Sequence, residues 1–304
     1  MIMKVLVTGA NGFIGKYVIR SLIGSSNSLK IFAVSQSSNN ETTHKNLTWI
    51  KLDLHDYEAT YSALKETAPD VLIHLAWYAE HGKFWTSLEN LKWISTTINL
   101  LRNFNEFGGK KAFISGTCAE YDSSPVPCEE DVTPIRPQSI YGKCKDLTHQ
   151  IAKDLCVNWD LELIWGRIFI PYGLGEPLKR LIPSSLKAMN DGLDIDATHG
   201  NQLRDFIHAS DVANAITLLS ISKVTSGAYN ISSGQAVSIK EILEICQKNS
   251  KRVSKIKYGS IPLPSHETQF LVGCNKKLTK AGWKNQNSIE NGILKYSEFY
   301  KKIN

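Results

Sequence analysis

The sequence predicts an α/β protein with a Rossmann-type, doubly wound parallel sheet and a smaller C-terminal substrate-binding lobe. Over the first 170 residues, short apolar runs alternate with helix-length amphipathic stretches. This order requires crossover connections, which place helices on both faces of a parallel sheet. The first apolar run leads directly into a glycine-spaced turn, which is typical of the same class. A length of 304 residues is enough for one large domain or for two that share a core.

The expected elements follow in order along the chain. Strands are expected at 3–8, 30–35, 48–52, 70–75, 110–115 and 162–168, and helices at 13–24, 57–67, 87–107, 139–157 and 179–191. After residue 170 prolines separate shorter elements, and closing helices are expected at 275–282 and 288–300. We therefore expect a dinucleotide-binding domain at 1–170 and a lobe at 171–304 that mainly binds the substrate. Residues near 205–232 are expected to return a helix and the strand Ala228–Ile231 to the sheet.

The segment 5–15 has the spacing of a phosphate-binding turn, with a strand before the glycines and apolar helix residues after them. Gly9 allows the tight turn, Gly12 allows a pyrophosphate to approach the main chain, and Gly15 allows the helix to pack on the strand. The helix N-terminus offers backbone N–H groups and the positive end of its dipole to the phosphates. The expected dinucleotide contacts in this segment are Gly9, Asn11, Gly12, Phe13, Ile14 and Gly15.

Ligands of an open parallel sheet bind beyond the carboxyl ends of the strands, so the residues just past each strand are candidate contacts. Ser35 ends the second strand, about 20 residues past the glycines, where an NAD site usually has an acidic residue for the ribose. No Asp or Glu occurs there before Glu41, and a hydroxyl can donate to a 2′-phosphate that a carboxylate would repel. The position therefore favours NADP(H) over NAD. The other expected contacts are Asp53 and Leu54 after the third strand and Leu75, Ala76 and Trp77 after the fourth.

A hydroxyl residue and a Tyr-x-x-x-Lys pair form the candidate catalytic set. The fifth strand leads into Thr117, and Tyr141 and Lys145 open a helix 24 residues later. Positions i and i+4 share a helix face, so we expect the Lys145 ammonium group near the Tyr141 hydroxyl. That charge and an oxidised nicotinamide would lower the phenol pKa from about 10 toward neutrality. Tyr141 would then exchange a proton with a carbonyl or carbinol oxygen that Thr117 holds by a hydrogen bond. Tyr61 and Lys65 have the same spacing, but no hydroxyl-bearing strand end is paired with them.

Composition argues against several other classes of protein. The six cysteines have neither C-x-x-C pairing nor histidines at metal spacing, so we expect reduced thiols and no metal site. The net charge of +6 is spread along the chain and basic residues do not alternate with aromatic ones, so nucleic-acid binding is not expected. No apolar run approaches the roughly 20 residues of a membrane span, and the N-terminus has no signal-peptide pattern. We therefore expect a cytoplasmic protein with no membrane partner.

Six blocks stand out in order along the chain: Thr8–Gly15, Leu72–Ala76, Ser115–Thr117, Tyr141–Lys145, Arg204–His208 and Ala281–Trp283. Together they resemble the extended short-chain dehydrogenase/reductases, the epimerases, dehydratases and reductases of nucleotide sugars. The resemblance implies an NAD(P)-dependent oxidoreductase whose C-terminal lobe binds a nucleotide-diphosphate sugar. It implies that Arg204 contacts the diphosphate, because a guanidinium matches phosphate oxygens; the alternative is a surface pair with Asp205. It also implies a homodimer formed through the helices at 87–107 and 139–157.

Departures from the family pattern narrow the expected reaction. The 4,6-dehydratases of this family have an Asp-Glu pair directly after the catalytic Thr, where this chain has Cys118 and Ala119, so dehydration is not expected. Glu120 is a candidate substrate contact, although an exposed loop carboxylate is equally consistent with the sequence. The segments 93–101, 115–122 and 167–175 resemble reductases of dTDP-4-keto-6-deoxyhexoses.

These observations predict NADPH-dependent reduction of the 4-keto group of a nucleotide-diphosphate 4-keto-6-deoxyhexose, a step of deoxysugar biosynthesis for O-antigens or other glycans. One alternative is an NAD-dependent nucleotide-sugar 4-epimerase, which holds its cofactor tightly and returns the hydride to the opposite face of the sugar. A second alternative is a dinucleotide-binding sensor without turnover. Such a sensor is expected to lose the Tyr or the Lys, and this chain has Thr117, Tyr141 and Lys145.

Overall fold

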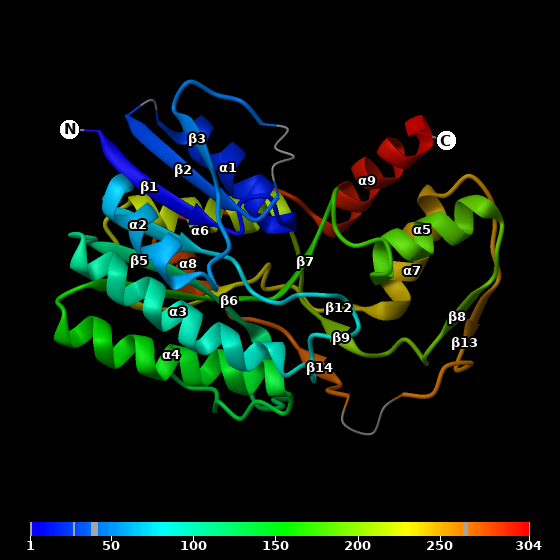
Figure 1. Ribbon diagram of the computed structural model, residues 1–304. Helices are drawn as coiled ribbons and strands as arrows, with labels where there is room; N and C mark the ends of the chain where they lie inside the picture. Colours follow the sequence, from blue (N-terminus) through cyan, green and yellow to red (C-terminus); the bar gives the residue numbers. More distant parts are fainter. Residues whose placement is uncertain (1, 27, 38–41, 264–266, 304) are drawn as a thin grey trace.

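A seven-stranded parallel sheet forms the centre of the protein (Figure 1). The computed structural model describes residues 2–26, 28–37, 42–263 and 267–303. The strands of the sheet are β1 (Met3–Thr8), β2 (Leu29–Ser35), β3 (Leu47–Lys51), β4 (Val71–His74), β5 (Lys111–Thr117), β6 (Glu162–Ile168) and β11 (Gly227–Ile231). Their order is β11-β6-β5-β4-β1-β2-β3, so the direction of winding reverses between β1 and β4. A sheet of this kind binds ligands beyond its strand ends at that point.

Helices cover both faces of the sheet. One face carries α1 (Phe13–Ser25) and α6 (Ala209–Ile221), and the other carries α2 (Tyr57–Thr67), α3 (Glu89–Glu106) and α4 (Ile140–Asn158). Each layer buries a separate apolar core against the strands. Val18 and Ile216 belong to the first core, and Leu101 and Phe104 belong to the second. The sheet is therefore buried on both sides, as parallel sheets require.

Local signals begin the helices that frame the site. The side chain of Asp56 accepts a hydrogen bond from the Ala59 N–H at the start of α2, and Ser139 accepts one from the Gly142 N–H at the start of α4. The start of α1 differs, because its N-cap is Gly12 and no side chain caps it. This helix end therefore presents main chain toward the sheet edge.

Shorter elements after residue 170 build a second lobe, on the right in Figure 1. They are β7 (Ile170–Tyr172), α5 (Leu181–Asp191), β8 (Ile195–Ala197), β9 (Leu203–Arg204), β10 (Phe206–His208), β12 (Val237–Ser238), α7 (Ile239–Asn249), β13 (Ile256–Tyr258), β14 (Phe270–Leu271) and α9 (Ile289–Ile303). The short helix α8 (Lys276–Lys280) instead packs against β11 of the central sheet. The buried carboxylate of Asp205 joins distant segments, because it accepts hydrogen bonds from the backbone N–H groups of Ser233, Gly234 and Gly273. Burial raises the pKa of Asp205 to about 6, despite these donors.

The predicted fold class is confirmed. The strands and helices expected before residue 170 lie within one or two residues of the observed ones. The fifth strand continues to Thr117, because its last residues pair in register with β6. Residues 227–231 form β11, which pairs with β6, and α6 packs against α1. The domain division at residue 170 stays a prediction. Within the described residues, we find no helix long and apolar enough to cross a membrane.

Candidate active site

The turn after β1 is shaped by glycine positions that other residues could not occupy. Gly9 has a φ of +66°, and a Cβ there would lie 2.8 Å from the backbone nitrogen of Ala76. A Cβ on Gly15 would lie 2.1 Å from the carbonyl oxygen of Gly9, so the first turn of α1 packs directly on the β1 turn. Gly12, the uncapped start of the helix, is exposed. This cradle fits a pyrophosphate, which needs close backbone and a helix N-terminus.

A cleft of about 340 Å³ lies beside this turn. Seven of the expected cofactor contacts line it: Gly9, Asn11, Gly12, Ser35, Leu54, Ala76 and Trp77. The remaining lining residues are Val34, Gln36, Ser37, Leu52 and Trp93. The other expected contacts lie close by without lining the cleft. Ile14 and Leu75 pack on the apolar core, Phe13 contacts the Tyr17 ring edge-on, and exposed Asp53 accepts a hydrogen bond from the His55 N–H.

The edge of the cleft beyond β2 is made of hydroxyl and amide groups. Asn11 Nδ2 donates to Ser37 Oγ at 2.8 Å, and the Ser37 N–H donates to Ser35 Oγ at 3.1 Å. Gln36 completes this edge. Glu41, the first acidic residue after it in the sequence, lies outside the described residues. The described edge therefore carries hydrogen-bonding groups and no carboxylate.

Thr117 and Tyr141 meet as expected. Thr117 ends β5 and is 7% exposed, and Tyr141 lies in the first turn of α4. Burial raises the pKa of the Tyr141 phenol above its ordinary value, and the nearby Thr117 side chain opposes that rise without cancelling it. The rings of Phe84 and Trp85 stand edge-on to Tyr141, and the Tyr141 N–H donates to the Trp85 carbonyl at 3.2 Å. The segment after β4 therefore fixes the position of Tyr141.

Lys145 does not act on Tyr141 as the spacing predicts. Its Nζ donates to the Ser115 carbonyl at 2.7 Å and lies 3.8 Å from the centroid of the Trp77 ring. Burial lowers the pKa of Lys145 to about 7, and the Glu120 carboxylate opposes that effect. The Lys145 ammonium group is held by these two partners. In the described structure, the groups that shift the pKa of Tyr141 are others, and Lys145 is not one of them. Lys145 instead contacts Trp77, which lines the cleft beside the β1 turn.

Two tryptophans and a buried asparagine in this region were not predicted as a unit. Trp93 on α3 stacks on Trp77 with ring centroids 6.0 Å apart. Asn90 is fully buried, accepts a hydrogen bond from Trp77 Nε1, and donates to the carbonyls of Phe84 and Ser87. Asn90 thus holds Trp77 and the segment that packs on Tyr141, the candidate catalytic tyrosine. The sequence signal was a polar residue one turn before Trp93, on a helix face that turns inward.

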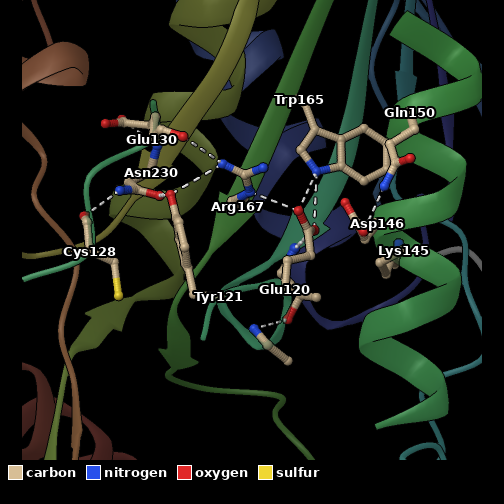
Figure 2. Close-up of polar contacts among 12 residues, drawn as sticks. Glu120, Tyr121, Cys128, Glu130, Lys145, Asp146, Gln150, Trp165, Arg167 and Asn230 are labelled. Atoms are coloured by element: carbon tan, nitrogen blue, oxygen red, sulfur yellow. Dashed lines mark hydrogen bonds and ion pairs between the residues drawn. The ribbon is translucent and has the colours of Figure 1, made fainter. Parts of the chain in front are cut away.

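Glu120 is the clearest departure from the sequence expectation. It ends a short 3-10 turn, η1 (Cys118–Glu120), and it is fully buried, so the interpretation as an exposed loop carboxylate is wrong. Figure 2 shows its carboxylate between Arg167 and Trp165 of β6. Both oxygens already accept hydrogen bonds from protein groups, and the backbone N–H of Thr117 is one donor, at 2.7 Å. Both carboxylate oxygens of Glu120 are therefore already hydrogen-bonded within the protein, which argues against Glu120 as a substrate contact.

Cys118 and Arg204 lie on the lobe side of Thr117. Burial raises the pKa of the Cys118 thiol to about 12, so it is a poor source of a proton or a thiolate at neutral pH. The Arg204 guanidinium forms an ion pair with Glu267 and not with Asp205, whose carboxylate is occupied by backbone donors. The alternative prediction, a surface ion pair between Arg204 and Asp205, is therefore wrong. In the residues that the structure covers, no group of three His, Cys, Asp or Glu side chains is placed to hold a metal ion.

A family profile described as the NAD dependent epimerase/dehydratase family matches residues 5–232. The chain belongs to this family. It is 28% identical over 278 residues to dTDP-6-deoxy-L-talose 4-dehydrogenase (NAD(+)) of Aggregatibacter actinomycetemcomitans, covering 89% of this chain and 99% of that protein. It is 27% identical over 296 residues to CDP-abequose synthase of Salmonella typhimurium, covering 95% of each.

Solved structures show the same fold. The UDP-glucose 4-epimerase of Thermus thermophilus, in a complex with NAD, has a TM-score of 0.88 and 22% identity, covering 98% of this chain and 99% of that one. The family membership makes the protein an NAD(P)-dependent enzyme of the extended short-chain dehydrogenase/reductase type. The cradle and cleft fit its nicotinamide dinucleotide, in agreement with that membership.

Proposed function

We propose that the protein reduces the 4-keto group of a nucleotide-diphosphate 4-keto-6-deoxyhexose with NADPH. Two observations support the proposal. The side chains of Thr117 and Tyr141 lie close together, and the edge of the cleft beyond β2 has hydroxyl and amide groups instead of a carboxylate. That edge favours a 2′-phosphate, which a carboxylate would repel. Two relatives whose names refer to a 6-deoxyhexose and to a CDP-linked sugar support the nucleotide-sugar class.

Thr117, Tyr141 and Lys145 each have one role in the proposed reduction. When bound, NADPH supplies the hydride that reduces the keto carbon. Thr117 orients the keto oxygen by a hydrogen bond, and Tyr141 gives that oxygen a proton, so the product is a secondary alcohol. We assign to Lys145 the binding of the nicotinamide ribose, for which its ammonium group would leave the Trp77 ring and the Ser115 carbonyl. A hydride and a proton enter the sugar, and NADP⁺ leaves.

Two features of the site argue against dehydration and support the lobe as the place for the sugar nucleotide. Dehydration needs an acid and a base next to Thr117, and the buried thiol of Cys118 and Ala119 provide neither. Arg204 is the expected diphosphate contact, with the substrate replacing Glu267 as its partner.

The proposal also includes the location and the oligomeric state of the enzyme, which we expect to be a cytoplasmic homodimer. Leu91 of α3 and Leu147 and Ile151 of α4 expose apolar surface on neighbouring helices.

The test is a steady-state assay with a panel of dTDP- and CDP-linked 4-keto-6-deoxyhexoses. Consumption of NADPH, with formation of the 4-hydroxy sugar, is the expected result. The competing function is an NAD-dependent 4-epimerase. The NAD(+) in the name of one relative, a dehydrogenase, favours the cofactor of that alternative. Protein that retains NAD through purification and interconverts two nucleotide sugars without net oxidation would establish that alternative. Binding of dinucleotide without turnover of any nucleotide sugar would support the sensor.

A further inference from the structure

The fully buried Glu120 lies at the centre of a polar network that joins β5, η1 and β6 (Figure 2). Its carboxylate accepts from Arg167 Nε at 2.7 Å, from Trp165 Nε1 at 3.0 and 3.1 Å, and from the Thr117 N–H at 2.7 Å. Each of these partners is a donor. An ionised carboxylate accepts a hydrogen bond from each of them. In a protonated carboxylic acid, the O–H group would face an N–H group, and these two donors cannot form a hydrogen bond with each other. Burial raises the pKa of Glu120, whereas Arg167 and the other donors lower it, so the network itself favours a negative charge at this position.

The first effect of that carboxylate is on the backbone of the catalytic threonine. Thr117 and Glu120 form a capping box: Thr117 Oγ1 accepts from the Ala119 N–H, and Glu120 accepts from the Thr117 N–H. These two bonds fix the peptide and the hydroxyl of Thr117 relative to the end of β5. The neighbouring Gly116 has no room for a side chain, since a Cβ would lie 2.7 Å from Glu120 Oε1. Glu120 is thus packed directly against the strand end that carries the reacting hydroxyl.

The second effect is on the charge of Lys145. Several titratable groups lie on the elements packed around it: His74 on β4, Glu120 on η1, Tyr141, Asp146 and His149 on α4, and Arg167 on β6. Burial lowers the pKa of His74 to about 3 and raises that of Tyr141, so both are uncharged near neutrality. The group that raises the pKa of Lys145 against its burial is Glu120. The same carboxylate therefore acts on Thr117 and on Lys145, and its charge also contributes to the raised pKa of Tyr141.

We propose that Glu120 is a positioning residue of the active site, whose carboxylate fixes the peptide of Thr117 and supplies the negative charge that balances the Lys145 ammonium group. The proposal rests on the proposed reduction, because it assigns Glu120 a part in orienting the keto oxygen and in holding the cofactor. Glu120 touches neither substrate nor dinucleotide in this role. Arg167 and Trp165 hold it in place from the adjacent strand.

Two substitutions separate the two effects. Glu120→Gln removes the charge, so we expect kcat to fall about 100-fold and the alkaline limb of kcat/KM to move to lower pH by about one pH unit. Glu120→Asp keeps the charge but withdraws it from the Thr117 N–H, so kcat should fall while the alkaline limb stays in place. Glu129→Gln is the matched control, because Glu129 is 45% exposed and 3.9 Å from Lys276. The control should behave like the wild type.

Either variant can overturn the proposal. A folded Glu120→Gln protein with the wild-type pH limb would remove the charge effect, and a Glu120→Asp protein with wild-type kcat would remove the positioning effect. If Glu120→Gln does not fold, Glu120→Asp decides, since it keeps a negative charge near Arg167, the ion-pair partner of Glu120. Fluorescence titration of NADPH binding against pH gives a readout without turnover. If no 4-keto sugar is reduced, the proposed function fails, whereas an unshifted binding profile in Glu120→Gln refutes the role of Glu120.

Discussion

Replacing Lys145 with methionine should stabilise the folded protein near neutral pH. Burial sets the pKa of the folded-state lysine at about 7, against the ordinary value of 10.5 expected for the unfolded chain. Between these two values the unfolded chain binds more protons than the folded chain, so the folded state becomes more stable as the pH rises. The lysine therefore costs most stability below pH 7 and almost none above pH 10.5. Methionine keeps the apolar stem and removes the charge.

The expected size follows from the two pKa values. Their difference is worth about 5 kcal/mol when the lysine is protonated in both states, and about 3 kcal/mol of that cost disappears between pH 7 and pH 9.5. Urea unfolding of both proteins at the two pH values measures it. The stability advantage of Lys145→Met should shrink by about 3 kcal/mol at the higher pH. Methionine lacks the hydrogen bond to Ser115 at both pH values, so the change between them reports the titration of the lysine in the wild-type protein.

Lys153→Met is the control, because Lys153 is exposed on the same helix. It should unfold with the same pH dependence as the wild type. A Lys145→Met advantage of equal size at pH 7 and pH 9.5 would refute the reasoning, since it would mean that the buried ammonium group carries no titration-dependent cost.

Three further predictions concern the reaction and the cofactor. Tyr141→Phe should lower kcat by about 10²–10⁴ with little change in NADPH affinity, and unchanged turnover would remove Tyr141 from the mechanism. Gly15→Ala should weaken dinucleotide binding and lower stability by about 1–3 kcal/mol, because its Cβ would meet the Gly9 carbonyl at 2.1 Å. Gly24→Ala in the same helix has open space and should stabilise by about 0.5–1 kcal/mol in thermal unfolding. Ser35→Asp should lower NADPH affinity about tenfold or more relative to NADH, and equal losses for both cofactors would contradict the assignment of the 2′-phosphate edge.

The sheet could be predicted from the sequence because its central strands are continuous apolar runs, as in β4, all of whose residues are buried. Thr117 and Tyr141 could be paired because strand ends and helix starts of such a sheet meet at one edge. The direction of the Lys145 side chain could not be predicted, since its partners Ser115 and Trp77 belong to other elements. The burial of Glu120 was equally hidden, because Trp165 and Arg167 lie 45 and 47 residues further along the chain.

The position of β11 has a consequence for any attempt to produce the N-terminal part alone. This strand comes from residues 227–231, yet it pairs along the outer side of β6. A fragment ending near residue 170 would leave the main-chain donors and acceptors of β6 open on that side, a template for pairing with another copy. Such a fragment should aggregate, whereas one that extends through Ile231 would close that side of the sheet.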